Sequence, residues 1–150
     1  MKRKPKVLFF STGNATRSRM AAAFLRRKLG DDLLEASTAV ASPEASPLGV
    51  EVMREVGVDI LREESRDVKE SLRESFACVV TMSDDSKERS PVWPFTRNIL
   101  HWSMADPANE HGPPERRKVV FRDVRDEIAR RVDEFAIEFA PRLMEAASTR

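Results

Sequence analysis

Short apolar runs alternate along the chain with longer segments in which apolar residues recur every three or four positions. The runs predict buried strands, and the periodic segments predict amphipathic helices. Four strands are predicted, at residues 6–10, 34–40, 76–82 and 98–102. Three helices are predicted, at residues 17–29, 46–56 and 116–147.

Glycine and proline mark where these elements end. Gly30 and Gly57 follow the first two predicted helices directly, as expected for residues that stop a helix. Pro141 predicts a kink or break near the end of the last helix, because proline lacks a backbone N–H group.

The alternation of strands and helices predicts one α/β domain over residues 1–150, a four-stranded parallel sheet with helices on both faces. The run 76–82 is apolar on both sides, as in the middle of such a sheet. Ligands bind beyond the carboxyl ends of parallel strands. We therefore expect the loops after residues 10, 82 and 102 to meet at one site.

Composition fits one domain and excludes several function classes. The chain has 150 residues, 41% of them hydrophobic, which is enough to fill a core. The net charge of +1, with both signs interspersed, argues against nucleic-acid and membrane partners. The apolar run after the basic residues 1–6 is too short for a secretory signal, and one cysteine, Cys78, makes no disulfide framework. These features predict a cytoplasmic protein.

The segment Ser11–Ser18 joins the first predicted strand to the first predicted helix. Such a loop points free backbone N–H groups and the positive end of the helix dipole at one place, which favours an anion. Gly13 and Asn14 tolerate positive φ, so the loop can fold inward, and Arg17 offers a planar fork to two oxygens. The predicted oxyanion-binding residues are Ser11, Thr12, Gly13, Asn14, Ala15, Thr16 and Arg17.

This loop resembles the signature of the low-molecular-weight protein tyrosine phosphatases and of the arsenate reductases that share their fold: cysteine, any five residues, arginine, serine. Ser11 occupies the cysteine position, with Arg17 and Ser18 in register. The resemblance implies that Ser11 stands where the nucleophile would be. It also implies that Arg17 clamps the anion and that Ser18 hydrogen-bonds the nucleophile position.

A second segment, residues 101–108, is similar to the His-Trp…Asp-Pro-Ala loop of arsenate reductases. The resemblance makes Asp106 the counterpart of the phosphatase general acid. Ala108 stands where those phosphatases usually carry tyrosine, and the chain contains no tyrosine, so the arsenate reductase branch is the closer match. Ala22 and Ala23 replace a glutamate and a glycine common in the family, which argues against a cation site that relies on that glutamate. No metal and no cofactor are expected.

Thioredoxin-coupled members of that branch carry two further cysteines, at positions that match Ser83 and Ser90. A thioredoxin-like reductant would be a partner only if these positions were cysteines. A serine hydroxyl has no sulfur redox chemistry and no nearby base in the motif, so arsenate reduction through these serines is excluded. Phosphoryl transfer through Ser11 is expected to be very slow, whereas binding of phosphate, sulfate or arsenate should survive.

Plainer interpretations exist for several of these residues. Cys78 lies a strand's length before Ser83, which favours a core cysteine over a redox residue. Asp106 before Pro107 also suits a simple turn, although its context favours the site. We expect packing roles for His101 and Trp102, a surface position for His111, and no metal set.

Two function classes remain open. The chain is either an enzyme of the arsenate reductase or phosphatase type whose cysteines have been replaced, or a natural non-catalytic relative that binds an oxyanion or a phosphoprotein. A pure interaction domain is disfavoured, because Arg17, Ser18 and Asp106 would then share no purpose.

Overall fold

All strands of the computed structural model, which describes residues 4–30, 35–40, 42–84 and 91–148, belong to one parallel sheet. The sheet has the order β3-β2-β1-β4-β5. The strands are β1 Lys6–Ser11, β2 Glu35–Val40, β3 Ser65–Asp67, β4 Cys78–Met82 and β5 Ile99–His101. The prediction of an α/β domain with a parallel sheet is confirmed, but its count of four strands is wrong. The three polar residues of β3 are too few to show a period.

The predicted helices are present, with shorter members beside them. The α-helices are α1 Thr16–Leu29, α2 Pro47–Arg54, α3 Val68–Leu72, α4 Pro114–Glu134 and α5 Ala140–Ser148. The 3₁₀ turns are η1 Ile60–Arg62 and η2 Pro107–Asn109, and η3 Phe135–Phe139 is a π-helical segment. Residue 34, the predicted start of the second strand, lies outside the described residues.

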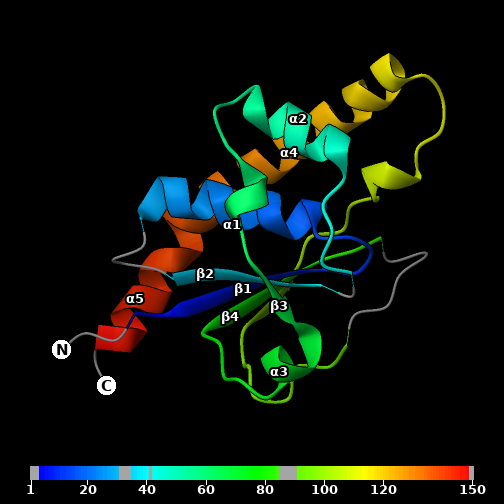
Figure 1. The fold of residues 1–150 in the computed structure, drawn as a ribbon. Helices are drawn as coiled ribbons and strands as arrows, with labels where there is room; N and C mark the ends of the chain where they lie inside the picture. Colours follow the sequence, from blue (N-terminus) through cyan, green and yellow to red (C-terminus); the bar gives the residue numbers. More distant parts are fainter. Residues whose placement is uncertain (1–3, 31–34, 41, 85–90, 149–150) are drawn as a thin grey trace.

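Helices cover both faces of the sheet, in unequal amounts. Figure 1 shows α1, α2 and α4 on one side and the short α3 on the other. Alternate residues of β1 divide accordingly, because successive side chains of a strand point to opposite faces. Val7 and Phe9 enter the larger core with α1 and α4, whereas Leu8 and Phe10 join a small cluster with Trp93.

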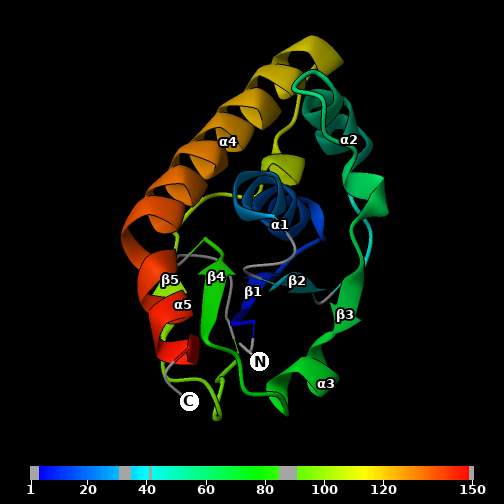
Figure 2. The ribbon, with the colours of Figure 1, turned by 90° about the vertical axis from the view of Figure 1, so that its left-hand side faces the viewer.

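The predicted C-terminal helix is interrupted where Pro141 indicated a break. The α-helix α4 passes into the π-helical segment η3, and α5 starts at Ala140. The Ala140 N–H donates to the Phe135 carbonyl oxygen, five residues back, and Pro141 has no N–H to continue the helix pattern. Figure 2 shows this helical run lying beside β5 and β4. Phe135 from the π-helical segment packs edge-on against Phe9 and Trp102.

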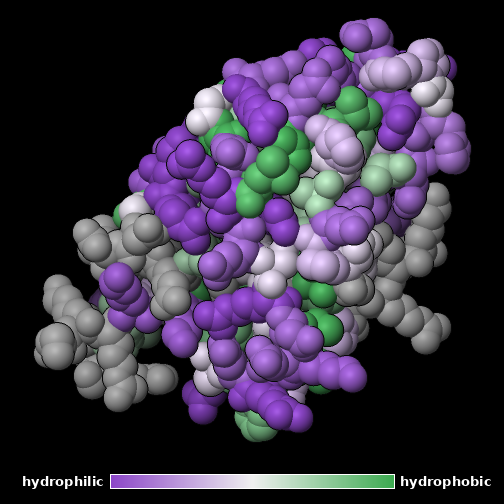
Figure 3. All heavy atoms as spheres, in the orientation of Figure 1, coloured by the Kyte–Doolittle hydropathy of each residue, from purple (hydrophilic) through white to green (hydrophobic). Residues whose placement is uncertain are grey.

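Hydrophilic residues cover most of the face shown in Figure 3, and hydrophobic residues appear there only in small areas. This agrees with the high share of charged residues, 34%. None of the helices in the described part of the chain has the length and apolar character that crossing a bilayer requires.

The strand order singles out the place between β1 and β4. β1 pairs with β2 on one side and with β4 on the other, so the winding of the chain reverses between β1 and β4. Crevices form at such a reversal, beyond the carboxyl ends of the strands. Residues 12–15 cross this edge directly after Ser11, which pairs with Met82 of β4.

Candidate functional site

The loop after β1 brings Ser11 and Ser18 together at the start of α1. Neither residue has exposed surface. The Ser11 Oγ lies 2.8 Å from the carbonyl oxygen of Asn14 and 2.9 Å from the Ser18 Oγ. Ser18 is therefore within hydrogen-bond reach of the Ser11 Oγ, the atom at the nucleophile position of the family that this loop resembles.

The backbone N–H groups of this loop fall into two sets. The N–H group of Ala15 donates to the Glu44 carbonyl at 2.6 Å, and that of Thr16 donates to the Asn14 Oδ1 at 3.0 Å. The expectation that all N–H groups from Thr12 to Thr16 serve an anion is therefore wrong for these two, because other acceptors take them. Within the described residues, the N–H groups of residues 12–14 donate no hydrogen bond, and the buried Thr12 Oγ1 has no partner.

Gly13 serves the site through its small size. Among the described residues, positive φ occurs only at Gly30, Gly57 and Gly112, so the expected left-handed backbone at Gly13 and Asn14 is wrong. A Cβ atom on Gly13 would lie 2.6 Å from the Asp106 Oδ2. The absent side chain is what admits this carboxylate to the loop.

Arg17 is the largest fully buried side chain in the described part of the molecule. Its NH1 donates to the Met104 carbonyl oxygen at 3.1 Å, and its NH2 lies 3.6 Å from the Asp106 Oδ2. The Met104 N–H in turn donates to the Ser83 carbonyl at 3.1 Å. The main chain of Met104 thus connects the arginine on α1 with the carboxyl end of β4, a contact that no sequence spacing indicated.

Asp106 precedes η2 and caps it. Its Oδ1 accepts a hydrogen bond from the Ala108 N–H at 2.9 Å, while the Oδ2 faces Arg17. Its side chain is only 7% exposed. The turn and the site interpretations of Asp106 are therefore compatible, because each carboxylate oxygen has a different role.

Ser83 lies at the same edge of the sheet as Ser11. It is buried and comes one residue after Met82, the β4 partner of Ser11. Ser90 lies outside the described residues. The structure thus brings one of the two predicted relay positions to the loop.

Cys78 lies at the other end of β4, opposite Val7 of β1. It is fully buried, and burial raises the pKa of its thiol to about 12. A thiol in this state is neither a nucleophile nor a ready redox group. The prediction that Cys78 belongs to the core is confirmed.

The remaining candidates lie outside the loop. The His101 Nδ1 is 2.6 Å from the Thr81 Oγ1, and the His101 side chain is exposed at the sheet edge. Trp102 is buried and packs against Phe9, as predicted. His111 is exposed. Among the described residues, no three histidine, cysteine, aspartate or glutamate side chains come together as metal ligands.

Sequence reasoning missed the contact that anchors the helix side of the loop. The Thr16 Oγ1 accepts a hydrogen bond from the Ser46 N–H at 2.8 Å, at the start of α2. A Cβ atom on Gly49 would clash with the Thr16 Cγ2, so α2 approaches α1 very closely there. In the sequence, only the small residue Gly49 indicated that α2 and α1 come this close.

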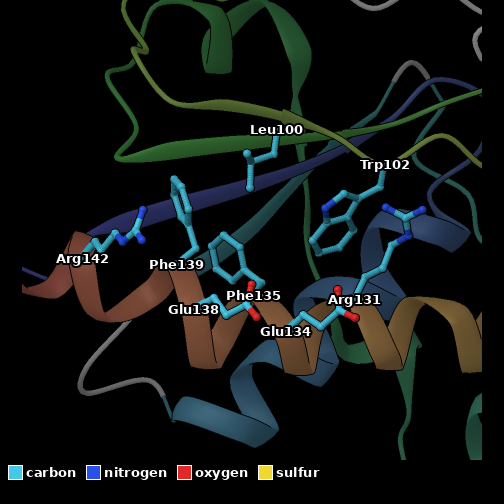
Figure 4. Close-up of a pocket in the computed structure, with 8 residues that line it drawn as sticks. All are labelled: Leu100, Trp102, Arg131, Glu134, Phe135, Glu138, Phe139 and Arg142. Carbon is cyan, nitrogen blue, oxygen red and sulfur yellow. The ribbon is translucent and has the colours of Figure 1, made fainter.

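A hollow of about 240 Å³ lies between β5 and the C-terminal helices (Figure 4). Its apolar lining consists of Leu100, Trp102, Phe135 and Phe139. Two arginines and two glutamates complete it, so the charges balance. It shares no lining residue with the Ser11–Ser18 loop and holds none of the predicted site residues.

Comparison with known proteins identifies the family of the chain. The chain is 34% identical over 133 residues to an arsenate reductase of Halalkalibacterium halodurans, which covers 89% of this chain and 96% of that protein. A structure described as an arsenate reductase in the phosphate binding state shares the fold, with a TM-score of 0.70, 24% identity, and coverage of 96% of this chain and 99% of the other.

A low-molecular-weight protein tyrosine phosphatase from T. tengcongensis has a TM-score of 0.63 and 27% identity, covering 89% of this chain and 98% of its own. The model of the low molecular weight phosphotyrosine protein phosphatase family matches residues 6–146. The chain therefore belongs to this family, and its curated relatives include arsenate reductases.

Proposed function

We propose that this protein binds a tetrahedral oxyanion, arsenate or phosphate, in the Ser11–Ser18 loop and that, as its sequence stands, it does not reduce arsenate. The observation that carries the proposal is the buried Arg17 at the start of α1, next to loop N–H groups that have no acceptor within the described residues. A guanidinium and several N–H groups facing one place form a site for an anion.

The residues then take distinct roles. Ser11 stands at the nucleophile position, with Ser18 beside it. The N–H groups of residues 12–14 and the Arg17 guanidinium hold the anion. Asp106 is the group placed to give a proton to a leaving oxygen, because its Oδ2 faces the loop.

The hydroxyl of Ser11 limits the chemistry. The field of the helix N-terminus and Arg17 lowers the pKa of a thiol from about 8.5 into the acidic range, but a serine hydroxyl starts several units higher. Reduction of arsenate to arsenite also needs two electrons, which thiols supply by forming a disulfide. Hydroxyl groups at positions 11, 83 and 90 have no equivalent reaction.

The alanine at position 108 favours a small free anion. Ala108 follows Pro107 at the place where the resembling phosphatases usually carry tyrosine. Without that ring, a phosphotyrosine side chain has little to stack against. The proposal therefore names arsenate and phosphate themselves as ligands.

Calorimetric titration and a reduction assay test the proposal together. The protein should bind phosphate and arsenate at one site, and should not reduce arsenate with thioredoxin as the only reductant. Lack of any anion binding would refute the site. Thioredoxin-dependent arsenate reduction by the unmodified chain would refute the chemical argument.

Restoring sulfur sharpens this test. The Ser11→Cys variant should hydrolyse an activated aryl phosphate: a sulfur–phosphorus bond forms, the aryl oxygen leaves with a proton that Asp106 takes from the singly protonated substrate, and water then releases phosphate. Repeated arsenate turnover with thioredoxin should additionally require Ser83→Cys and Ser90→Cys. Turnover by Ser11→Cys alone would contradict the relay roles of positions 83 and 90.

A further inference from the structure

The two oxygens of Asp106 have different surroundings. The Oδ1 is used as the cap of η2, where it accepts the Ala108 N–H. The Oδ2 lies 3.6 Å from the Arg17 NH2 and 2.6 Å from the place that a Cβ of Gly13 would take. The capping bond therefore fixes the carboxylate with its second oxygen at the loop.

An anion held by Arg17 and by the loop N–H groups lies close to this Oδ2, because the Oδ2 approaches both the Arg17 NH2 and Gly13 in the middle of the loop. A carboxylate oxygen only accepts hydrogen bonds. An oxyanion that carries a proton can donate its O–H group to the Oδ2. A fully deprotonated oxyanion instead places two negatively charged acceptors in contact, in a site where the carboxylate is only 7% exposed.

Size and shape do not distinguish these ligands. Phosphate and sulfate are both tetrahedral and have similar dimensions, as have arsenate and selenate. Phosphate and arsenate keep at least one proton at neutral pH, whereas sulfate and selenate keep none. The N–H groups and the guanidinium only donate, so they do not detect this proton.

We propose that Asp106 makes this site selective for oxyanions that carry a proton, phosphate and arsenate, over sulfate and selenate. The inference rests on the proposed function, since it concerns the same loop. Polar sites reject a ligand that lacks the hydrogen bond they are built to make, because a buried group then has no partner.

Net charge does not separate these ligands. Hydrogen phosphate and sulfate both carry two negative charges, and Arg17, whose NH2 lies 3.6 Å from the Asp106 Oδ2, attracts either one. The proton of hydrogen phosphate is therefore the difference to which Asp106 responds.

Calorimetric titrations at neutral pH and constant ionic strength test this inference. The unmodified protein should prefer phosphate to sulfate, and arsenate to selenate, by at least about tenfold. In the Asp106→Asn variant the amide offers a donor as well as an acceptor, and it can still cap η2. We expect the preference to shrink to within about threefold, mainly through tighter binding of sulfate and selenate.

Glu110→Gln is the matched control, because it removes one negative charge from an exposed residue at the end of η2. It should keep the preference of the unmodified protein. Equal affinities for phosphate and sulfate would overturn the inference, and so would an Asp106→Asn variant that keeps the full preference. In either case, binding of phosphate would still support the proposed function. Failure to bind any of the four anions would instead overturn the proposed function itself.

Discussion

The two ends of β4 differ in how their surroundings treat a negative charge. At the amino end, the Cys78 thiol is buried in the core, and burial raises its pKa to about 12. At the carboxyl end, the Ser83 carbonyl accepts from the Met104 N–H, and the Met104 carbonyl accepts from the buried Arg17. Burial around Cys78 penalises an anion, whereas Arg17 and the helix N-terminus stabilise one.

This contrast teaches that a cysteine in such a chain is not evidence of thiol chemistry. Under the proposed function, the surroundings that would stabilise a thiolate lie around Ser11, where the chain has a hydroxyl group. The existing thiol lies where a thiolate is costly. The proposal therefore treats anion binding and the nucleophile as separable properties of the site.

The largest effect is expected from Arg17, because it supplies the positive charge at the carboxyl end. Arg17→Ala should lower phosphate affinity at least about 100-fold, and Arg17→Lys should lower it less, since the charge remains but the two-pronged fork is lost. Titration calorimetry measures both variants. Arg27→Ala, an exposed arginine of the same helix, should leave the affinity unchanged.

Thermal unfolding of the Arg17 variants controls for folding. A folded Arg17→Ala protein that binds phosphate as tightly as the unmodified chain would contradict the assignment of the site.

Gly13 gives the next largest effect. The added Cβ of Gly13→Ala meets the Asp106 Oδ2 at 2.6 Å, so the carboxylate or the loop must shift. Phosphate affinity should fall about tenfold, an effect typical of a displaced binding group. In a double-mutant cycle with Asp106→Ala the two effects should not add, because the clash needs both groups. Simple additivity would show that Gly13 acts independently of Asp106.

A substitution at the amino end of β4 should change stability without changing binding. Cys78→Ser buries a hydroxyl in the apolar core and should lower the free energy of unfolding by about 1–3 kcal/mol. Denaturant unfolding and phosphate titration measure the two properties on the same sample. Weaker phosphate binding by a folded Cys78→Ser protein would link the two ends of the strand that we treat as separate.

The smallest effect concerns Glu55, in an ion-pair network between α2 and α4. Hydrogen bonds from Arg122, and also from Arg125, lower the pKa of Glu55 from 4.5 to about 2. Because the pKa of Glu55 is lowered in the folded protein, its ionised carboxylate stabilises the fold above pH 4.5, and this stabilisation is lost as the pH falls toward 2.

Melting temperatures of the unmodified protein and of Glu55→Gln measure this effect. Their difference should amount to a few degrees at most, because the network is partly exposed, and it should shrink between those two pH values. A difference that stays constant on acidification would mean that the ion pairs are not its source.

Apolar periodicity predicted the long elements of the fold well. It predicted β1, α1 and β4 because each has a continuous run or face of buried residues. It missed β3 and α3, which are three and five residues long and mostly polar. Their positions depend on pairing with β2 and on covering the second face of the sheet, which are tertiary effects.

The site was predicted in its residue types more than in its contacts. The family resemblance implied that Ser18 lies beside Ser11, and their Oγ atoms are 2.9 Å apart. Spacing could not show that the Glu44 carbonyl takes the Ala15 N–H, because Glu44 comes from a separate loop. It also assigned Gly13 a conformational role, when the relevant fact is the approach of Asp106 from a distant segment.

The central claim is that the Ser11–Ser18 loop stabilises negative charge, and the thiol introduced by Ser11→Cys tests it most directly. Its pKa is measured from the pH dependence of alkylation by iodoacetamide, with Cys78→Ala in the same chain to remove the other thiol. We predict a value well below the ordinary value of about 8.5, rising toward it when Arg17→Lys is added. A thiol at position 11 with an ordinary or raised pKa would contradict the account.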